Sequence, residues 1–360
     1  MGNQLRRREI QAGDTSRPER RRYRPGDRCV QEPLRLSGLS QKRHLRDYGL
    51  GEEFTGFFVI RSKDLRTKRN GEPYLVLEFG DRSGRLYGNI WEDAERVYRE
   101  LEVGGVVKLQ GRIEQYRDAL QVGIRRLRPA QPDDEIDHSD LVPVSDIDPR
   151  EGLERLRRNA DTLANPFLKK LLKLILEDEE LTPSLLKAPG GKLWHHNRRG
   201  GLIEHTLSLC WICRFLARMY PEVDRDLLLA GAILHDIGKI EEYSCDTLID
   251  FTDRGRLIGH ITIGAQIVAD YAAEIDDFPP GLLDRLTHMI LSHQAEFDSP
   301  VLPKIREAFL LHYADQIDSK MDAFRRISSE LQPDEKWRFV RLLDRFINFS
   351  RADDDQDGDQ

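Results

Sequence analysis

The sequence predicts a multidomain protein in which a small N-terminal β-barrel precedes an all-α helical bundle. Residues 54–130 contain short segments in which apolar and polar side chains alternate, as they do in half-buried strands. From about residue 149 onward, apolar residues instead recur at spacings of three and four, as on one face of a helix. The chain has 360 residues, which is enough for two domains of this kind. It lacks the alternation of strands and helices that predicts a parallel sheet.

The β-rich segment has the element order of one particular small barrel. The run "FTGFFVIRSKDL" is typical of a strand, "RNGEP" of a turn, and "YLVLEFGD" and "SGRLYGNIW" of two further strands. The helical stretch "EDAERVYREL" follows, and the strands "VVKLQGRIEQY" and "LQVGIRRLRP" complete the set. Three strands, a helix and two strands is the order of an OB-fold, a Greek-key barrel that often binds single-stranded nucleic acid or oligosaccharide.

Basic and aromatic residues are interleaved in this segment, which favours binding of single-stranded nucleic acid. Bases stack on exposed rings while cations contact the phosphates. The loop 61–71 is its most basic part, and we expect substrate contacts from Arg66, Lys68, Arg69, Tyr74 and Tyr87. Three other aromatic residues are expected to fill the barrel, namely Phe57, Phe79 and Trp91. The alternative is that every ring belongs to the core and that the loop is only a solvated hairpin.

Composition suggests the boundaries of the remaining parts. Residues 1–50 form an Arg-rich arm that we expect to be largely disordered, because it has too little apolar surface to bury. It either contacts nucleic acid by counterion release or is only a solvated extension. We expect the OB-fold over 51–130, an acidic linker over 131–148, the helical domain over 149–348 and an acidic disordered tail over 349–360. Helices are expected at about 202–220, 224–238, 258–275, 279–293, 302–329 and 334–349, with a short hairpin within 241–259.

Charge, cysteine content and hydropathy exclude several classes of protein. The net charge of -7 is not that of a uniformly basic nucleic-acid binder. Cys210 and Cys213 have no second pair at metal-ligand spacing, so we expect them to be buried and reduced. The longest apolar run, 227–234, is too short to cross a bilayer, and the N-terminus lacks the apolar segment of a secretory signal. We therefore expect a cytoplasmic protein with no membrane contact.

Residues able to bind metal recur within apolar helical stretches at five places in the chain. Burying imidazole or carboxylate there is costly without a partner, and the recurrence argues against isolated core histidines. We expect six metal ligands: His205, His235, Asp236, His260, His293 and Asp315. A structural zinc takes four ligands, whereas six nitrogen and oxygen ligands can hold two divalent ions. Ligand type favours Mn, Fe, Co, Ni or Zn over Ca, and two such ions suit hydrolysis of a phosphodiester.

Other polar residues near these positions are candidates for phosphate contacts. Lys239 follows His235 by four residues, so a continuous helix would place both on one face, and we expect Lys239 and Asp236 to be catalytic. The loop before the first ligand is expected to bind substrate through His196, Arg198 and Arg199, with His195 a weaker candidate. The alternative is that these loop residues have no role. Asp318 lies one turn after Asp315 and is expected to support a ligand.

The motifs together resemble a known family. The pattern around "HDIGK" looks like that of the HD-domain phosphohydrolase superfamily. More narrowly, "HHNRRGGLIEHTLSL", "LLLAGAILHDIGKIEEY", "GHITIGA" and "LLHYADQIDSKMDAF" resemble the YhaM-type 3′→5′ exoribonucleases over roughly residues 50–345. The resemblance implies an OB-fold joined to an HD domain, and Mn²⁺-favoured trimming of single-stranded RNA, or single-stranded DNA, to 5′-mononucleotides. It also implies metal roles for the six expected ligands and matches Lys239 to the lysine of the motif.

One position departs from the family pattern, and some alternatives stay open. Family members usually read "SHHG" where this chain reads "SHQA", so Gln294 replaces a second histidine. One alternative is an HD-type phosphohydrolase or phosphodiesterase acting on free nucleotides, which would not need an OB-fold. Another is a non-catalytic RNA-binding protein with a decayed metal site. The metal, with Co²⁺, Fe²⁺, Ni²⁺ and Mg²⁺ beside Mn²⁺, is open, as is a homo-oligomer formed by pairing of apolar helices.

Overall fold

The computed structural model describes residues 43–350 except 118, 193–194, 296–298, 330 and 332–334. The greater part of the expected arm, residues 1–42, and the tail from 351 lie outside the described residues. Residues 43–50, which we assigned to the arm, are ordered. They contain the 3-10 helix η1 (Leu45–Asp47), and its Leu45 is buried in the barrel core. The ordered part of the barrel domain therefore begins before residue 51.

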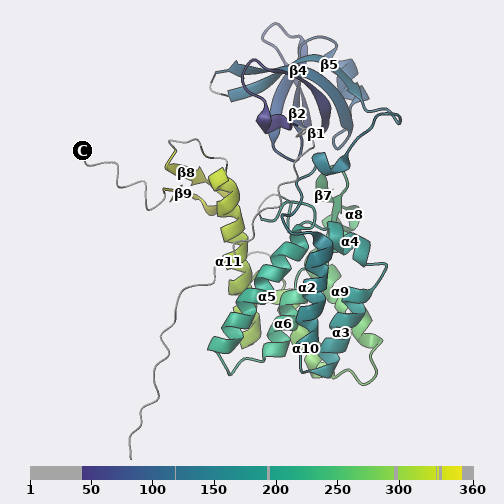
Figure 1. The fold of residues 1–360 in the computed structure, drawn as a ribbon, viewed down its shortest axis with the longest axis vertical. Helices are drawn as coiled ribbons and strands as arrows, with labels where there is room; N and C mark the ends of the chain where they lie inside the picture. The colour runs from purple at the N-terminus through teal and green to yellow at the C-terminus, as the bar shows by residue number, and fades with distance from the viewer. Residues whose placement is uncertain are drawn as a thin grey trace, which may run out of the picture. The chain divides into compact units, whose positions relative to one another are not determined.

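The first domain is a closed five-stranded barrel, and its element order confirms the OB-fold expectation (Figure 1). The strands meet in the order β1-β2-β3-β5-β4, with β3 and β5 paired parallel and the other neighbours antiparallel. The elements are β1 (Glu53–Thr67), β2 (Pro73–Gly80), β3 (Arg85–Ile90), α1 (Ala94–Glu100), β4 (Val106–Tyr116) and β5 (Ala119–Pro129). Inward-facing residues alternate along the strands, and Leu75, Leu77 and Phe79 of β2 are completely buried.

The second domain is built mainly from helices, as expected, and its described residues also contain two small hairpins (Figure 1). Its helices pack around one apolar core that runs from α2 to α11. Side-chain caps from Asp148, Asn165 and Asp224 fix the beginnings of α2, α3 and α6. The helices are α2 (Pro149–Asp161), α3 (Pro166–Glu177), α4 (Thr182–Lys187), α5 (Gly201–Met219), α6 (Arg225–Leu234), α7 (Lys239–Glu242), α8 (Asp253–Ile258), α9 (His260–Ala273), α10 (Pro280–Ser292) and α11 (Arg306–Ser329).

Two short segments bear on the expectations for this domain. The hairpin expected within 241–259 is confirmed as β6 (Tyr243–Cys245) paired with β7 (Ile249–Phe251). The helix expected over 334–349 is wrong: this segment contains β8 (Trp337–Val340), the 3-10 helix η3 (Arg341–Leu343) and β9 (Arg345–Asn348). Its aromatic residues also satisfy a period of two, and Phe339 pairs with Phe346 across the strands.

Among the described residues, no helix is long and apolar enough to cross a membrane. Cys210 and Cys213 are confirmed as buried free cysteines on α5. Burial raises the pKa of the Cys210 thiol to about 12 and also raises that of Cys213. Neither side chain is therefore suited to act as a thiolate ligand at neutral pH.

Candidate metal centre

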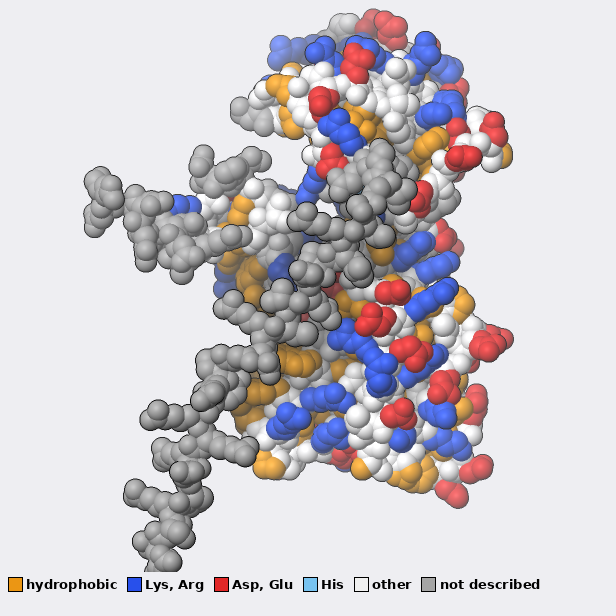
Figure 2. Space-filling view, in the orientation of Figure 1, with side chains coloured by type: hydrophobic (Ala, Val, Ile, Leu, Met, Phe, Trp, Pro, Cys, Tyr) orange, Lys and Arg blue, Asp and Glu red, His pale blue; other side chains and the backbone are white. Residues whose placement is uncertain are grey.

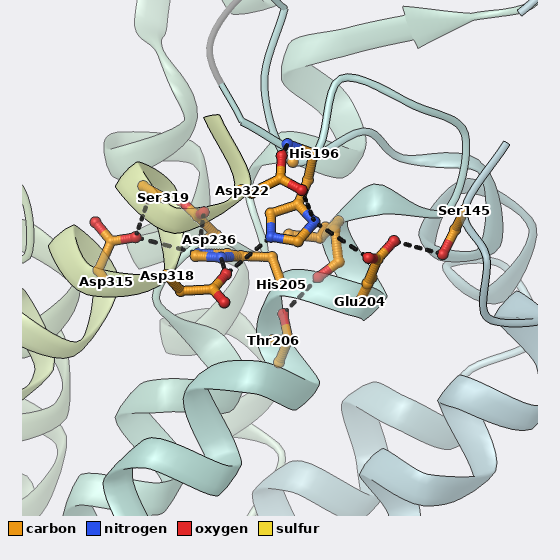
Figure 3. A network of polar contacts seen from close by, with 12 residues as sticks. Ser145, His196, Glu204, His205, Thr206, Asp236, Asp315, Asp318, Ser319 and Asp322 are labelled. Atoms are coloured by element: carbon orange, nitrogen blue, oxygen red, sulfur yellow. Dashed lines mark hydrogen bonds and ion pairs between the residues drawn. The ribbon is translucent and has the colours of Figure 1, made fainter. Parts of the chain in front are cut away.

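His205 on α5 is held between two carboxylates of α11 (Figure 3). Its Nε2 lies 3.2 Å from Oδ1 of Asp315, and its Nδ1 lies 2.7 Å from Oδ2 of Asp318. The helices pack against each other, and all three side chains are buried. Asp318 therefore orients the ring from behind, as expected for a supporting residue, and directs Nε2 toward the other candidate ligands.

His235 and Asp236 lie in a tight turn between two helices. We expected a continuous helix through residue 238, but α6 ends at Leu234 and α7 begins at Lys239. A Cβ at Gly238 would lie 2.1 Å from the carbonyl oxygen of His260, so only glycine lets the start of α9 approach this closely. The turn therefore places Asp236 next to the histidine that begins α9.

Asp236 is shared by two groups of histidines. Its Oδ2 lies 3.2 Å from Nε2 of His235 and 3.7 Å from Nε2 of His205. Its Oδ1 lies 3.5 Å from Nε2 of His260 and 3.5 Å from Nε2 of His293. Two triads of potential ligand atoms result, His205–His235–Asp236 and Asp236–His260–His293. A carboxylate with one oxygen in each triad is suited to bridge two metal ions.

Three of the imidazoles are oriented by hydrogen bonds at Nδ1. His235 donates to the carbonyl of Ala232 at 3.1 Å, and His293 donates to that of Ile290 at 2.8 Å. The Nδ1 of His260 lies 2.9 Å from Oε1 of Glu242, a buried carboxylate. In each ring a proton on Nδ1 leaves the lone pair on Nε2, which faces Asp236.

The charges in the cluster are strongly coupled. Burial alone would lower the pKa of His205, but hydrogen bonds with Asp315 and Asp318 outweigh it and raise that pKa to about 10. Burial would raise the pKa of Asp236, but the charges of His235 and Lys239 hold it well below its usual range. A proton on His205 therefore partly balances the buried carboxylates. A divalent cation would supply that positive charge instead and displace the proton.

The donor set fits metal ions. Asp236 Oδ1 and His293 Nε2 are buried and make no hydrogen bond within the described part of the chain. Each unsatisfied buried polar atom costs about 1–3 kcal/mol, and a cation between the triads would satisfy both. All the atoms concerned are imidazole nitrogens and carboxylate oxygens, which suit transition-metal dications.

Lys239 is buried beside the cluster, although it does not continue the helix of His235. Its Nζ lies 2.6 Å from Oδ2 of Asp236, and it also donates to the carbonyl of Gly190. The ammonium is therefore held next to the shared carboxylate. A phosphate at the metal centre would find this cation within the same buried site.

The paired histidines before α5 lie on different sides of His205. Both ring nitrogens of His195 are buried and lack a hydrogen-bond partner among the described residues. One nitrogen of His195 falls within 4.8 Å of candidate ligand atoms of His205 and Asp315. His196 instead bonds through Nε2 to Asp318 at 2.8 Å, behind the ring of His205 (Figure 3). From the sequence we favoured His196 for substrate contact, whereas the geometry favours His195. The two residues are adjacent in the chain, so nothing in the sequence distinguishes their positions.

The two arginines of the same loop are bound to protein groups. Arg198 lies 2.7 Å from Oε1 of Glu204 and 2.8 Å from Oδ1 of Asp322. Arg199 donates to the carbonyl of Cys245 at 3.1 Å. These contacts hold the loop in place beside α5, and they use the guanidinium groups that we expected to bind phosphate.

Gln294, the position that departs from the family pattern, lies at the edge of the second triad. Its side-chain nitrogen lies 3.1 Å from Nε2 of His260. The two amide orientations place either its oxygen or its nitrogen at this position. With the oxygen inward, glutamine could serve the second triad in place of a histidine.

On the barrel, aromatic and basic residues form an exposed surface. Trp91 is 55 % exposed and stacks on Tyr74 with ring centroids 5.0 Å apart, so the expectation that Trp91 fills the barrel is wrong. The residue follows β3 at the rim, where its ring cannot enter the core. Phe79 is confirmed as a core residue, and Phe57 is half-buried under Lys108.

The other barrel residues that we expected to contact substrate differ in their exposure and in their partners. Tyr87 is exposed, and Lys68 lies 5.8 Å above the Trp91 ring. Arg66 pairs with Asp64, and Arg69 is exposed at the tip of the β1–β2 loop. A cleft of about 260 Å³ beside Trp91, not expected from the sequence, is lined also by Asn89, Arg112 and Arg125. Its residues come from β3, β4 and β5, and only their pairing brings them together.

Sequence and structure comparisons relate this chain to several known proteins. The family model described as HD domain matches residues 202–320. The 3′-5′ exoribonuclease YhaM of Oceanobacillus iheyensis is 34% identical over 288 residues, 79% of this chain and 90% of the relative. That of Shouchella clausii is 31% identical over 302 residues, 83% of this chain and 94% of the relative. One solved structure, the second OB-fold domain of replication protein A from Methanococcus maripaludis, is 13% identical, covers 26% of this chain and 98% of its own, and has a TM-score of 0.21.

The fold and the match to the HD model define the class of protein: an HD-domain protein that carries an N-terminal OB-fold. The long relatives narrow this class, because they align with this chain across both domains. The chain belongs to the YhaM family of 3′-5′ exoribonucleases.

Proposed function

We propose that this protein is a metal-dependent 3′→5′ exoribonuclease that hydrolyses phosphodiester bonds of single-stranded RNA to 5′-mononucleotides, with single-stranded DNA as an alternative substrate. The observation that carries the proposal is Asp236, whose two oxygens face two different histidine groups. The relatives named above act as 3′-5′ exoribonucleases, which supports the direction of degradation. We also propose that the protein is cytoplasmic, because its buried free cysteines suit a reducing compartment.

We propose that two divalent ions bind here, with Mn²⁺ favoured over Co²⁺, Fe²⁺, Ni²⁺ and Mg²⁺. One ion would be held by His205, His235, Asp236 and Asp315, and the other by Asp236, His260 and His293. Bound there, the ions would lower the pKa of a coordinated water and neutralise charge on a phosphoryl group.

The side chains around the metal centre have separate tasks in this proposal. Lys239 stabilises negative charge that develops on the scissile phosphate, because its ammonium is already fixed by Asp236. His195 contacts the substrate, since its nitrogens are free of protein partners in the described residues and lie beside His205. His196, Arg198 and Asp322 position His205 and its loop from behind.

The barrel binds the single strand upstream of the reacting nucleotide. Bases stack on the Trp91–Tyr74 pair and on Tyr87, while Lys68, Arg112 and Arg125 contact phosphates. Arg69 at the tip of the loop adds further positive charge, and Arg66, now paired with Asp64, would have to exchange that carboxylate for a phosphate. A free mononucleotide would use none of these groups, which argues against the free-nucleotide alternative.

The test is digestion of 5′-labelled single-stranded RNA by the full chain, with and without Mn²⁺, resolved at single-nucleotide length. We expect Mn²⁺-dependent shortening from the 3′ end, which Asp236→Ala abolishes while RNA binding persists. Hydrolysis of nucleoside triphosphates or cyclic nucleotides in place of RNA would support the first alternative. RNA binding without hydrolysis under every metal tried would support a decayed metal site. Undiminished activity of Asp236→Ala would refute the assignment.

A further inference from the structure

An exposed apolar stripe runs along the outer face of α5. Trp211, Phe215 and Met219 follow one another at intervals of four residues, and all three are more than half exposed. Trp211 is the most exposed of them, at 75 %. Residues four apart lie on one side of a helix, so the three side chains form a continuous row.

A second stripe of the same kind lies on α11. Phe309, Tyr313, Ile317 and Met321 again recur every four residues and are 46–59 % exposed. The inward side of this helix is fully used, because Asp315 and Asp318 there face His205. The outward side carries large apolar side chains that stay about half exposed in the described part of the chain.

The two stripes belong to neighbouring antiparallel helices. Arg306, the first residue of α11, donates to the carbonyl of Glu222, three residues after α5 ends, at 3.2 Å. At the other end, Glu204 and Asp322 share Arg198. Hydrophobic side chains gather over this side of the helical domain in Figure 2. The two rows are therefore parts of one surface, which we call the α5–α11 face.

The area of the α5–α11 face is that of a stable protein interface. With about 200 Å² for a large side chain, its seven exposed residues offer on the order of 800 Å². A standard interface buries about 800 Å² on each partner, whereas the largest apolar patch of a typical monomer is about 300–600 Å². An apolar surface above that range calls for a partner.

Two segments of the sequence outside the described residues are alternatives to a second copy as cover for this face. Residues 351–360, "RADDDQDGDQ", contain no apolar residue larger than alanine, and residues 1–42 include ten arginines, whose charge does not suit an apolar face. A second copy, in contrast, presents the same two antiparallel stripes. Related by a two-fold axis, two such helix pairs would form a four-helix contact that buries both faces at once.

We propose that the α5–α11 face is the interface of a symmetric homodimer of this protein. The inference is independent of the nuclease proposal, since it rests on the outward sides of α5 and α11 and not on the metal centre. Dimerisation would also bear on the metal centre, because the two helices that would meet carry His205 and Asp315 on their inward sides.

The test is the mass of the full-length protein by sedimentation velocity over a range of concentrations. We expect a dimer for the unaltered chain and monomers for Phe215→Glu and Ile317→Glu. Each substitution occurs twice across a two-fold interface, so we expect at least ~100-fold weaker association. Leu257→Glu is the matched control: Leu257 is 85 % exposed but lies on α8, and its variant should remain dimeric.

Thermal unfolding identifies any variant that has lost its fold, and Tyr313→Glu replaces one that has, since this side chain also points outward. A monomer at every concentration of the unaltered chain would overturn the proposal. So would an unchanged dimer in the folded Phe215→Glu and Ile317→Glu variants. Photocrosslinking of single-stranded RNA to Trp211 in a monomeric protein would assign the face to nucleic acid instead, and would equally overturn it.

Discussion

Glu242 contacts His260 twice and can be altered without removing any proposed metal ligand. Its Oε1 lies 2.9 Å from the backbone nitrogen of His260 and 2.9 Å from the Nδ1 of the same residue. The carboxylate is buried, and although burial would raise its pKa, the hydrogen bond with His260 leaves that pKa lowered. Glu242 is therefore ionised at neutral pH and fixes the ring with Nε2 toward Asp236.

Glu242→Gln keeps the shape of the side chain and one acceptor oxygen but removes the charge. A hydrogen bond to a charged acceptor is worth ~1 kcal/mol more than one to a neutral acceptor, so two bonds lose about 2 kcal/mol. We expect Mn²⁺ to bind about 30-fold more weakly. This lies within the 10–100-fold range for loss of a group that orients a metal-ligating histidine.

The assay is Mn²⁺ titration by calorimetry, followed by RNA digestion at low and at saturating Mn²⁺. We expect Glu242→Gln to regain most of its activity at high Mn²⁺, because no ligand is lost. Glu241→Gln is the control, since that neighbouring carboxylate pairs with Arg254 at the surface. Unchanged Mn²⁺ affinity in a folded Glu242→Gln protein would refute the role of the Glu242–His260 pair.

Three other predictions follow from the described contacts. Trp91→Ala should raise KM for single-stranded RNA by about 5–150-fold at similar kcat, because stacking of one base is worth ~1–3 kcal/mol; an unchanged KM would remove Trp91 from the binding surface. Cys210 and Cys213 should resist alkylation at pH 8 in the native protein and react after denaturation, since burial raises both thiol pKa values; mass spectrometry of the labelled peptides checks this. Burial would raise the pKa of Glu204, but hydrogen bonds from His196, Arg198 and Ser145 hold it well below 4.5. The contribution of Glu204 to stability is therefore present above about pH 4.5 and is lost as the pH falls toward the lowered folded-state pKa. The melting temperature of Glu204→Gln should thus depend less on pH between 3 and 6 than that of the unaltered protein.

The sequence predicted most of the fold because local patterns specify it. Alternation marked the barrel strands, and the helical periodicity marked α5, α9 and α10. The predictions were wrong where the same sequence pattern fits both a helix and a strand. Residues 337–348 satisfy both a helical and a strand period, and only pairing of β8 with β9 distinguishes them.

The candidate site was likewise predictable from the sequence only in part. Residue type and apolar context singled out six residues, and the structure brings them into one cluster in which five are buried and His260 is half-buried. The sharing of Asp236 by two triads was not predictable, because it depends on the break between α6 and α7 and on the approach of α9 to Gly238. The different positions of His195 and His196 also depend on tertiary contacts, in particular those with Asp318 and Asp322.

The shared carboxylate of Asp236 has a consequence for how the protein responds to metal supply. An ion in one triad would fix the position of Asp236 and thereby prepare the oxygen that faces the other triad. Occupancy of the two sites would then be positively coupled, and each ion would raise the affinity for the other by the same factor. Activity plotted against free Mn²⁺ would rise with a Hill coefficient between one and two. The enzyme would thus switch on over a narrow interval of metal concentration.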